Sequence, residues 1–297
     1  MKVFRGVSLI LSILSVVGLG ALAYAQNRGT LRVGLDLVVV PVTVTDPQNR
    51  HVTDLGPEHF EVFEDKVEQK VETFSTESVP ISLGVIFDIS HSMRDTIAAA
   101  RDAAVALLRD SETTDEYFLI EFSDGADLTQ DFTANVDHLE NRIIMTVADG
   151  RTALYDAIYL GIEKVNAGKN PRKALLVITD GEDNHSRYSF SNIKQRLRES
   201  DVQIYGIGLN SGLGRAYLTQ LSEISGGQVF FPDPAKELEA ASRKITTQLK
   251  SQYVLGYIST NSSRDGKWRN IRVRVNPPTG SSRMTVRAKT GYYGPAS

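Results

Sequence analysis

The chain has 297 residues, of which 41% are hydrophobic and 23% charged, as in an ordinary globular protein large enough for one or two domains. Its formal net charge of -3 argues against nucleic acid as the main partner, because proteins that bind phosphate backbones normally carry a clear basic excess. The absence of cysteine excludes disulfides, thiolate metal sites, a cysteine nucleophile and a lipid-modified cysteine. We therefore expect a hydrophobic core to supply the stability.

The first 25 residues have the pattern of a secretory signal peptide. Lys2 and Arg5 form a basic region, residues 6–22 an apolar region, and residues 23–25 an A-x-A cleavage motif. The pattern predicts cleavage near Ala25 and an exported mature protein, periplasmic or extracellular. The alternative is an uncleaved membrane anchor, because the apolar stretch approaches the ~17–25 residues that span a bilayer.

The segment that follows, residues 26–78, is β-like. Residues 37–45 are rich in β-branched side chains and end at turn-forming residues 46–49. Residues 60–64 alternate between apolar and charged side chains, and residues 69–74 alternate again, as half-buried strands do.

Residues 79–250 alternate between strand and helix patterns, which predicts a doubly wound, Rossmann-like α/β domain with right-handed crossovers. The runs 83–87 and 175–178 are continuously apolar, as expected for parallel strands covered on both faces. The expected strands are 83–87, 117–122, 174–179, 203–209 and 228–231. The expected helices are 96–108, 136–147, 153–165, 191–199, 215–224 and 235–248.

The C-terminal segment, residues 251–297, returns to β structure, with strands expected at 253–258, 271–275 and 284–288. It carries eight basic residues and one acidic residue, whereas residues 26–79 carry five basic and ten acidic residues. Neither segment is large enough to fold alone. We therefore expect the two to pack together as a β-sandwich module, with the α/β domain inserted between them. The alternative is two separate β appendages.

Hydroxyl and carboxylate side chains follow two of the expected parallel strands and open one of the helices. The carboxyl ends of parallel strands meet at one edge of the sheet, so we expect these side chains to converge there. Hard oxygen ligands favour Mg²⁺, Mn²⁺ or Ca²⁺ over zinc or copper. The candidate metal ligands are Asp88, Ser90, Ser92, Thr152 and Asp180. So few protein ligands would leave a coordination position for water or for a carboxylate from a partner.

Three pieces of this sequence carry a family resemblance: Asp88-x-Ser90-x-Ser92, Thr152 within Gly150-x-Thr152-Ala153-Leu154, and Thr179-Asp180-Gly181. Together they resemble the metal-ion-dependent adhesion site (MIDAS) of von Willebrand factor type A (VWFA) domains. The resemblance covers residues 79–250 and implies a Rossmann-like fold that binds Mg²⁺ or Mn²⁺ and engages protein partners. The flanking segments resemble bacterial VWFA-related exported proteins. His91 departs from the pattern, because a small residue is common between the two serines.

Other polar residues close to these motifs have simpler interpretations. We interpret His91 and His185 as exposed loop histidines rather than transition-metal ligands. Glu182 and Asp183 are expected to form a solvated acidic loop. We expect Asp156 to have a structural role, because an acidic side chain stabilises the N-terminal turn of a helix.

The functional hypothesis is an exported, non-enzymatic binding protein for adhesion or assembly, whose metal ion grips an exposed Asp or Glu of a protein partner. The alternative is a structural subunit of a cell-envelope complex with a latent metal site. A metal-dependent phosphohydrolase that uses Asp88 as nucleophile is disfavoured, because Ser90 stands where such enzymes place a second acid. A Ser-His-Asp hydrolase is weaker still, because no nucleophile elbow is present. The sequence makes no prediction of oligomeric state.

Overall fold

The computed structural model describes residues 37–109, 112–209, 214–233, 237–280 and 282–296. The predicted signal peptide and its cleavage site lie outside these residues. Among the described helices, none combines the length and the apolar character needed to cross a membrane. The described residues form an α/β module and a β module.

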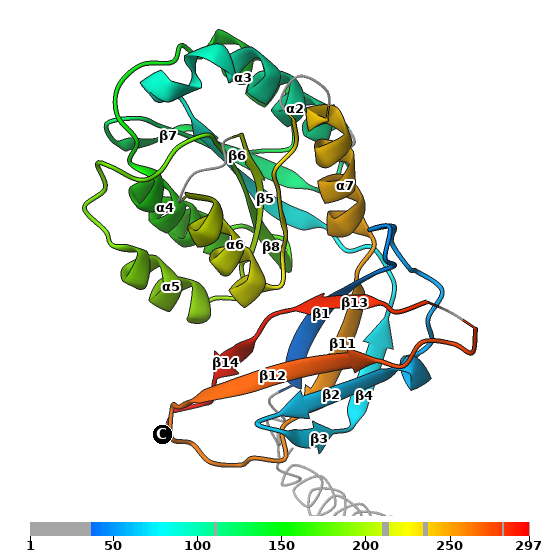
Figure 1. Ribbon diagram of the computed structural model, residues 1–297. Helices are drawn as coiled ribbons and strands as arrows, with labels where there is room; N and C mark the ends of the chain where they lie inside the picture. The colour runs from blue at the N-terminus through cyan, green and yellow to red at the C-terminus, as the bar shows by residue number, and fades with distance from the viewer. Residues whose placement is uncertain (1–36, 110–111, 210–213, 234–236, 281, 297) are drawn as a thin grey trace, which may run out of the picture. The chain divides into compact units, whose positions relative to one another are not determined.

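The α/β module is built on a six-stranded sheet with the strand order β10-β9-β8-β5-β6-β7 (Figure 1). Five of its strands are parallel, and β7 runs antiparallel to β6 at one edge. The strands are β5 (Ile81–Asp88), β6 (Glu116–Phe122), β7 (Ala126–Thr133), β8 (Arg172–Thr179), β9 (Gln203–Gly208) and β10 (Val229–Phe230). Every residue of β5 is buried, which explains why its sequence is continuously apolar rather than alternating.

Helices cover both faces of this sheet (Figure 1). Apolar residues of α2, α3 and α7 join one core cluster with the sheet, and those of α4, α5 and α6 join another. The helices are α2 (Ile97–Arg109), α3 (Val136–Met145), α4 (Leu154–Asn166), α5 (Phe190–Arg198), α6 (Gly214–Ser225) and α7 (Leu238–Lys250). A short 3₁₀ helix, η2 (His91–Asp95), precedes α2. The prediction of a doubly wound, Rossmann-like domain is confirmed.

The β module consists of two four-stranded antiparallel sheets, with the orders β13-β1-β11-β4 and β14-β12-β2-β3. Its N-terminal elements are β1 (Leu37–Thr45), η1 (Pro57–His59), β2 (Phe60–Glu64), β3 (Val67–Gln69) and β4 (Val71–Ser75). Its C-terminal elements are β11 (Tyr253–Ile258), β12 (Trp268–Val275), β13 (Thr285–Ala288) and β14 (Gly291–Tyr293). Side chains from both sheets share one core cluster, so the predicted β-sandwich of N- and C-terminal strands is confirmed.

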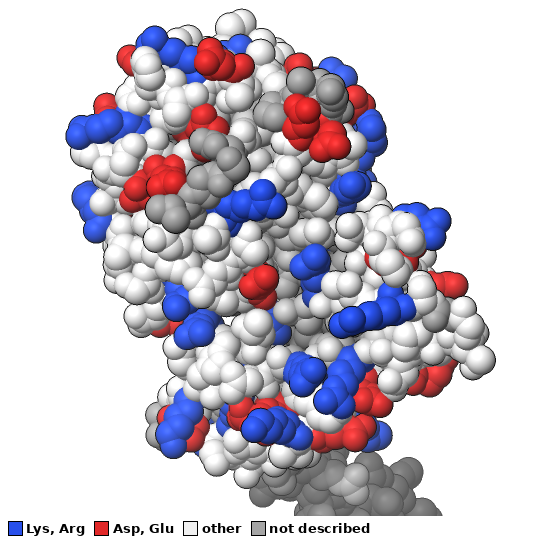
Figure 2. All heavy atoms as spheres, in the orientation of Figure 1, with Lys and Arg blue, Asp and Glu red and all other residues white. Residues whose placement is uncertain are grey.

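The opposite charges of the two terminal segments meet where their strands pair. The basic strand β12 lies beside the acidic strand β2, with Arg274 opposite Glu61. Elsewhere, on the face shown in Figure 2, acidic and basic side chains are interspersed over both modules.

A buried glutamine connects the two modules. Gln252, between α7 and β11, donates to Thr43 Oγ1 of β1 (3.3 Å) and to Tyr205 Oη of β9 (2.9 Å). Its Oε1 accepts from the Arg172 guanidinium at the start of β8 (2.7 Å). One amide thus joins a strand of the β module to two strands of the central sheet.

The structure differs from the expected elements at three places. Strand β7 was not expected, because its sequence ADLTQDFT is largely polar, and most of its side chains are at least partly exposed at the sheet edge. The expected strand 69–74 is two strands in different sheets, since β3 pairs with β2 and β4 pairs with β11. Strand β14, which is three residues long and pairs with β12, was not among the expected strands.

A buried polar network holds the β module together between its sheets. Glu64 and the Arg269 side chain are 2% and 3% exposed, with Arg269 Nη1 lying 3.5 Å from Glu64 Oε1. Glu64 also accepts from the hydroxyls of Tyr257 (2.8 Å), Tyr292 (2.9 Å) and Ser259 (2.6 Å). Removing one member of such a buried pair leaves the other charge unpaired, which typically costs about 3–5 kcal/mol.

We therefore expect Arg269→Met to lower the free energy of unfolding of the β module by about 3–5 kcal/mol. Urea unfolding followed by the fluorescence of Trp268, the single tryptophan, measures this change. Lys267→Met is the control, because the Lys267 side chain is 79% exposed and pairs only with Asp265 nearby. Equal stability of the two variants would contradict a structural role for the network.

Candidate functional site

The candidate site is organised around Asp88, the last residue of β5, whose side chain is fully buried. Its Oδ1 accepts a hydrogen bond from the backbone N–H of Ser90 (2.8 Å). Its Oδ2 accepts from the hydroxyl of Thr179 (2.5 Å), the last residue of the neighbouring strand β8. The parallel register of β5 and β8 thus brings the two strand ends into contact across 91 residues of sequence.

A chain of hydroxyl contacts continues from Asp88 toward solvent. Ser90 Oγ lies 3.0 Å from Ser92 Oγ, and Ser92 Oγ donates to Asp180 Oδ1 (2.8 Å). Ser90 is buried, whereas Ser92 is exposed and Asp180 is partly exposed. The site is therefore deep at Asp88 and open at Ser92 and Asp180.

Thr152, just before α4, lies on the other side of the same group. A Cβ placed on Gly181 would come within 3.5 Å of Thr152 Oγ1 and 3.7 Å of Asp88 Oδ2, so both side chains flank this glycine. The Thr152 backbone is fixed by Asn184, whose side chain accepts from the Thr152 N–H (2.9 Å) and whose N–H donates to the Thr152 carbonyl (3.0 Å). The structure therefore places all five candidate ligands around one point at the carboxyl edge of the sheet.

Burial affects the protonation of both carboxylates of the group. Burial raises the pKa of Asp88 to about 6, although hydrogen bonds from Thr179 and Ser90 act in the opposite direction. Burial also raises the pKa of Asp180, and here the hydrogen bond from Ser92 opposes the shift. Neither carboxylate forms an ion pair with a Lys, Arg or His among the residues that the structure describes. A cation between them would offset the cost of burying their charge.

The donor set fits a hard divalent ion. It combines two carboxylates with three hydroxyls, which are the oxygen ligands that Mg²⁺, Mn²⁺ and Ca²⁺ accept. Within the described parts of the chain, no cluster of three or more His, Cys, Asp or Glu side chains is arranged to hold a metal. The candidate site is of another kind, because only Asp88 and Asp180 belong to those residue types and its other three candidate ligands are hydroxyls.

Residues near the site have defined structural contacts. Asp183, expected in a solvated loop, instead accepts from the Tyr155 N–H (3.2 Å) and the Ser186 hydroxyl (2.5 Å), and so caps the first turn of α4. Asp156 accepts from the N–H groups of Arg187 (2.9 Å) and Tyr188 (3.0 Å), which fastens the loop after Asp180 to α4. Glu182 is exposed.

The two histidines near the site differ in exposure, because His91 is exposed, as expected, whereas His185 is partly buried. His91 Nδ1 lies 3.9 Å from Asp149 Oδ1, and both side chains are largely exposed. The backbone of His185 donates to the Thr152 carbonyl (3.1 Å).

Three supporting residues were not assigned roles from the sequence. Thr179 appears in the motif Thr179-Asp180-Gly181, but its bond to Asp88 depends on the register of two strands distant in sequence. Asn184 had no signal, because an asparagine in a loop is common. Gly150 has φ = 85°, which favours glycine, and its carbonyl accepts from the His91 N–H (2.9 Å).

Comparisons with known proteins bear on the family and the fold of this chain. The family model described as "von Willebrand factor type A domain" matches residues 83–244. The mouse protein inter alpha-trypsin inhibitor, heavy chain 4, is 25% identical over 248 residues, which cover 76% of this chain and 26% of that protein. The chain thus spans about a quarter of the length of that relative.

Solved structures share the fold at low sequence identity. An aerotolerance-related membrane protein from Bacteroides fragilis aligns with a TM-score of 0.50 and 17% identity, over 57% of this chain and 98% of that one. Proximal thread matrix protein 1 from the mussel byssus aligns with a TM-score of 0.52 and 15% identity, over 63% of this chain and 51% of that one. Another structure of the mussel protein, with a zinc-occupied MIDAS motif, gives a TM-score of 0.50 and 14% identity, over 63% and 49% of the two chains.

The matched segment, residues 83–244, is more than half of the chain, and it contains both strand ends and the helix start that form the site. Domains of this type commonly mediate protein–protein interactions. The chain belongs to the von Willebrand factor type A domain family.

Proposed function

We propose that this chain is an exported protein that binds a protein partner through a divalent metal ion at the carboxyl edge of its central sheet. The observation that carries the proposal is the burial of Asp88, which forms no ion pair with any described residue, beside hydroxyls that lead out to solvent. The N-terminal signal-peptide pattern supports export. Adhesion or assembly outside the cytoplasm is the role that unites these features.

The residues that would hold the ion are of two kinds, charged carboxylates and neutral hydroxyls. Asp88 and Asp180 supply negative charge, and the hydroxyls of Ser90, Ser92 and Thr152 supply neutral oxygens. When bound, the ion supplies a Lewis-acidic coordination position for an acidic side chain. Because Ser92 and Asp180 form the open side of the group, an Asp or Glu of the partner would approach past them.

Such a site stabilises a complex rather than catalysing a reaction. The described residues around it include no histidine or lysine bonded to a hydroxyl as a base would be to a nucleophile. VWFA domains are in general adhesion or interaction proteins. We therefore propose a binding role for the site, with no turnover of substrate.

The metal site is tested first by calorimetry of the purified protein with Mg²⁺, Mn²⁺, Ca²⁺ and Zn²⁺. We expect saturable binding by the wild type and a higher melting temperature, since a ligand at 100 times its Kd adds about 2.7 kcal/mol of stability. In Asp88→Asn we expect binding to be lost. The melting temperature of the metal-free variant should equal or exceed that of the metal-free wild type, because a neutral amide removes the buried, uncompensated charge.

Asp149→Asn is the matched control, because Asp149 lies beside the site but its side chain is 81% exposed and contacts none of the five candidate ligands. It should bind metal as the wild type does. Absence of metal binding by the wild type would instead support a latent site in a structural subunit.

The partner contact is tested with immobilised protein and a peptide library in which single Asp or Glu residues are compared with Asn or Gln. We expect binding only of acidic peptides, and only with metal present. Thr152→Val should weaken this binding at least tenfold, or about 1.4 kcal/mol, because it removes a ligand oxygen without changing side-chain size.

Thr96→Val controls for loss of an ordinary hydroxyl, since the Thr96 hydroxyl bonds to Met93 within its own turn and to no other described residue. The proposal fails if amide and acid peptides bind equally, or if binding persists in EDTA.

A further inference from the structure

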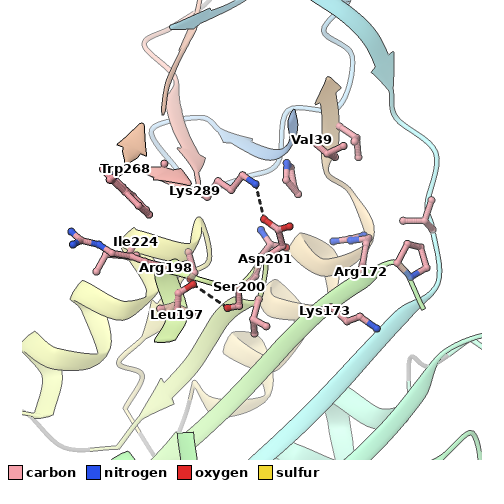
Figure 3. A pocket seen from close by; sticks show the side chains of 18 of the residues that line it. Val39, Arg172, Lys173, Leu197, Arg198, Ser200, Asp201, Ile224, Trp268 and Lys289 are labelled. Carbon is pink, nitrogen blue, oxygen red and sulfur yellow. Dashed lines mark hydrogen bonds and ion pairs between the residues drawn. The ribbon is translucent and has the colours of Figure 1, made fainter. Parts of the chain in front are cut away.

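A second candidate site lies far from the metal ligands, at the other end of the central sheet. A cavity of about 420 Å³ opens between the β module and the amino ends of β8 and β9 (Figure 3). This volume lies within the ~300–1,000 Å³ typical of small-molecule sites. Strand β8 has Arg172 in the cavity at its first residue and Thr179 beside Asp88 at its last.

The walls of the cavity are mainly apolar and come from both modules. The β module contributes side chains of β1 and β11, and the α/β module contributes side chains of α5, α6 and the loop before β9. The main apolar residues are Val39, Pro41, Leu197, Val202, Ile224 and Val254. Val39 is 44% exposed although it lies in the middle of β1, because it faces this space.

Positive charge is concentrated on the same lining. Arg172, Lys173, Arg198 and Lys289 line the cavity, and Asp201 is the one acidic residue among them. Figure 3 shows Lys289 and Asp201 facing each other between Arg198 on one side and Arg172 on the other. Asp201 Oδ1 lies 2.7 Å from Lys289 Nζ, so this carboxylate is already neutralised, and its 81% exposure places it at the mouth.

Two of these cations have unused hydrogen-bonding capacity. The Nε atoms of Arg172 and Arg198 are buried and have no hydrogen-bond partner among the described residues. Arg172 donates through Nη2 to Gln252, and the Arg198 guanidinium lies 4.9 Å from the centre of the Trp268 ring. The enclosed Nε atoms are out of reach of a ligand, so a carboxylate in the cavity would meet the Nη atoms of a guanidinium.

Nearby acids of the chain are committed to other contacts. Asp115 accepts from the backbone N–H of Ile81 (3.0 Å) and from the Tyr117 hydroxyl (3.1 Å). Glu116 accepts from the Ser82 hydroxyl (2.7 Å) and the Lys169 N–H (2.6 Å). Burial lowers the pKa of Arg172 and of Lys173, and the charges of Asp115 and Glu116, respectively, oppose these shifts in part. The cavity thus combines apolar walls with positive charge that the surrounding chain leaves partly unmatched.

We propose that this cavity binds a small amphipathic carboxylate, an apolar chain that packs against Val39 and Ile224 and ends in an acid group received by Arg172. The ligand bridges the β module and the α/β module. Two sources share this chemistry, a free acyl chain and the C-terminus of an apolar peptide. The site is independent of the proposed metal-dependent function, because Arg172 lies at the amino end of β8, whereas the candidate ligand Asp180 follows its carboxyl end.

Trp268 gives a direct readout, because it lines the cavity and is the single tryptophan of the chain. We expect decanoate to cause a saturable change in its fluorescence, unchanged by EDTA. Decan-1-ol, which has the same chain without the charge, should bind at least tenfold more weakly. An apolar tetrapeptide with a free or an amidated C-terminus forms the second arm, and the tighter of decanoate and free tetrapeptide identifies the source.

Variants separate the roles of charge and space. Arg172→Met should weaken decanoate binding at least tenfold and leave decan-1-ol unaffected, whereas Val39→Phe should weaken both by filling the cavity. Arg109→Met is the control, because the Arg109 side chain is 72% exposed and contacts Glu140 instead of the cavity. The proposal is overturned if neither carboxylate changes the fluorescence, or if decanoate and decan-1-ol bind equally. Unchanged decanoate binding by both Arg172→Met and Val39→Phe would overturn it as well.

Discussion

The antiparallel pairing of β1 with β11 is the constraint on which the arrangement of this chain depends. The register runs from Leu37 opposite Ile258 to Val42 opposite Tyr253, so the first described strand is held against one that follows the whole α/β module. The entropic cost of closing a loop rises only slowly with the length of the loop. Burial of Val40, Val42 and Leu255 in the sandwich core offsets this cost. The α/β module must therefore leave the sandwich after β4 and return to it at β11.

The group of candidate metal ligands has a different physical character, because burying a carboxylate without an ion-pair partner costs stability. A fully buried carboxylate at the end of β5 would ordinarily be replaced by an apolar residue or matched with an arginine. Here Asp88 is held by the Ser90 N–H and the Thr179 hydroxyl, which orient the carboxylate without neutralising it. A carboxylate buried at such a cost is typical of functional sites that bind a ligand. From Ser90, the hydroxyl contact to the exposed Ser92 connects this buried region with the surface.

Much of the fold could be predicted because the α/β module is locally consistent. Buried parallel strands require continuous apolar runs, and the helices between them begin and end within a few residues of the expected positions. Strand β7 escaped prediction because an exposed edge strand needs no apolar pattern. The break between β3 and β4 escaped as well, since alternation continues through Lys70 although the chain changes sheets there.

The five candidate ligands were visible in the sequence because each stands directly after a strand or before a helix. Their supports were not, since the Thr179–Asp88 and Asn184–Thr152 contacts depend on tertiary register. The cavity between the modules was beyond prediction for the same reason. Its lining comes from segments as distant as Val39 and Lys289, and no local pattern records how two modules pack.

The strand ladder that closes the chain also determines how the molecule would carry a mechanical load. Leu37 lies at one end of the β1–β11 ladder, whereas Tyr253, which follows the α/β module, lies at the other. The exit to that module, after Ser75, is at the Tyr253 end too, because Ser75 pairs with Val254. A force that pulls Leu37 away from the α/β module therefore acts along the strands and loads the ladder hydrogen bonds together instead of opening them one after another. A molecule held at Leu37 and at the edge of the central sheet that carries the candidate metal ligands would resist tension through this shear geometry.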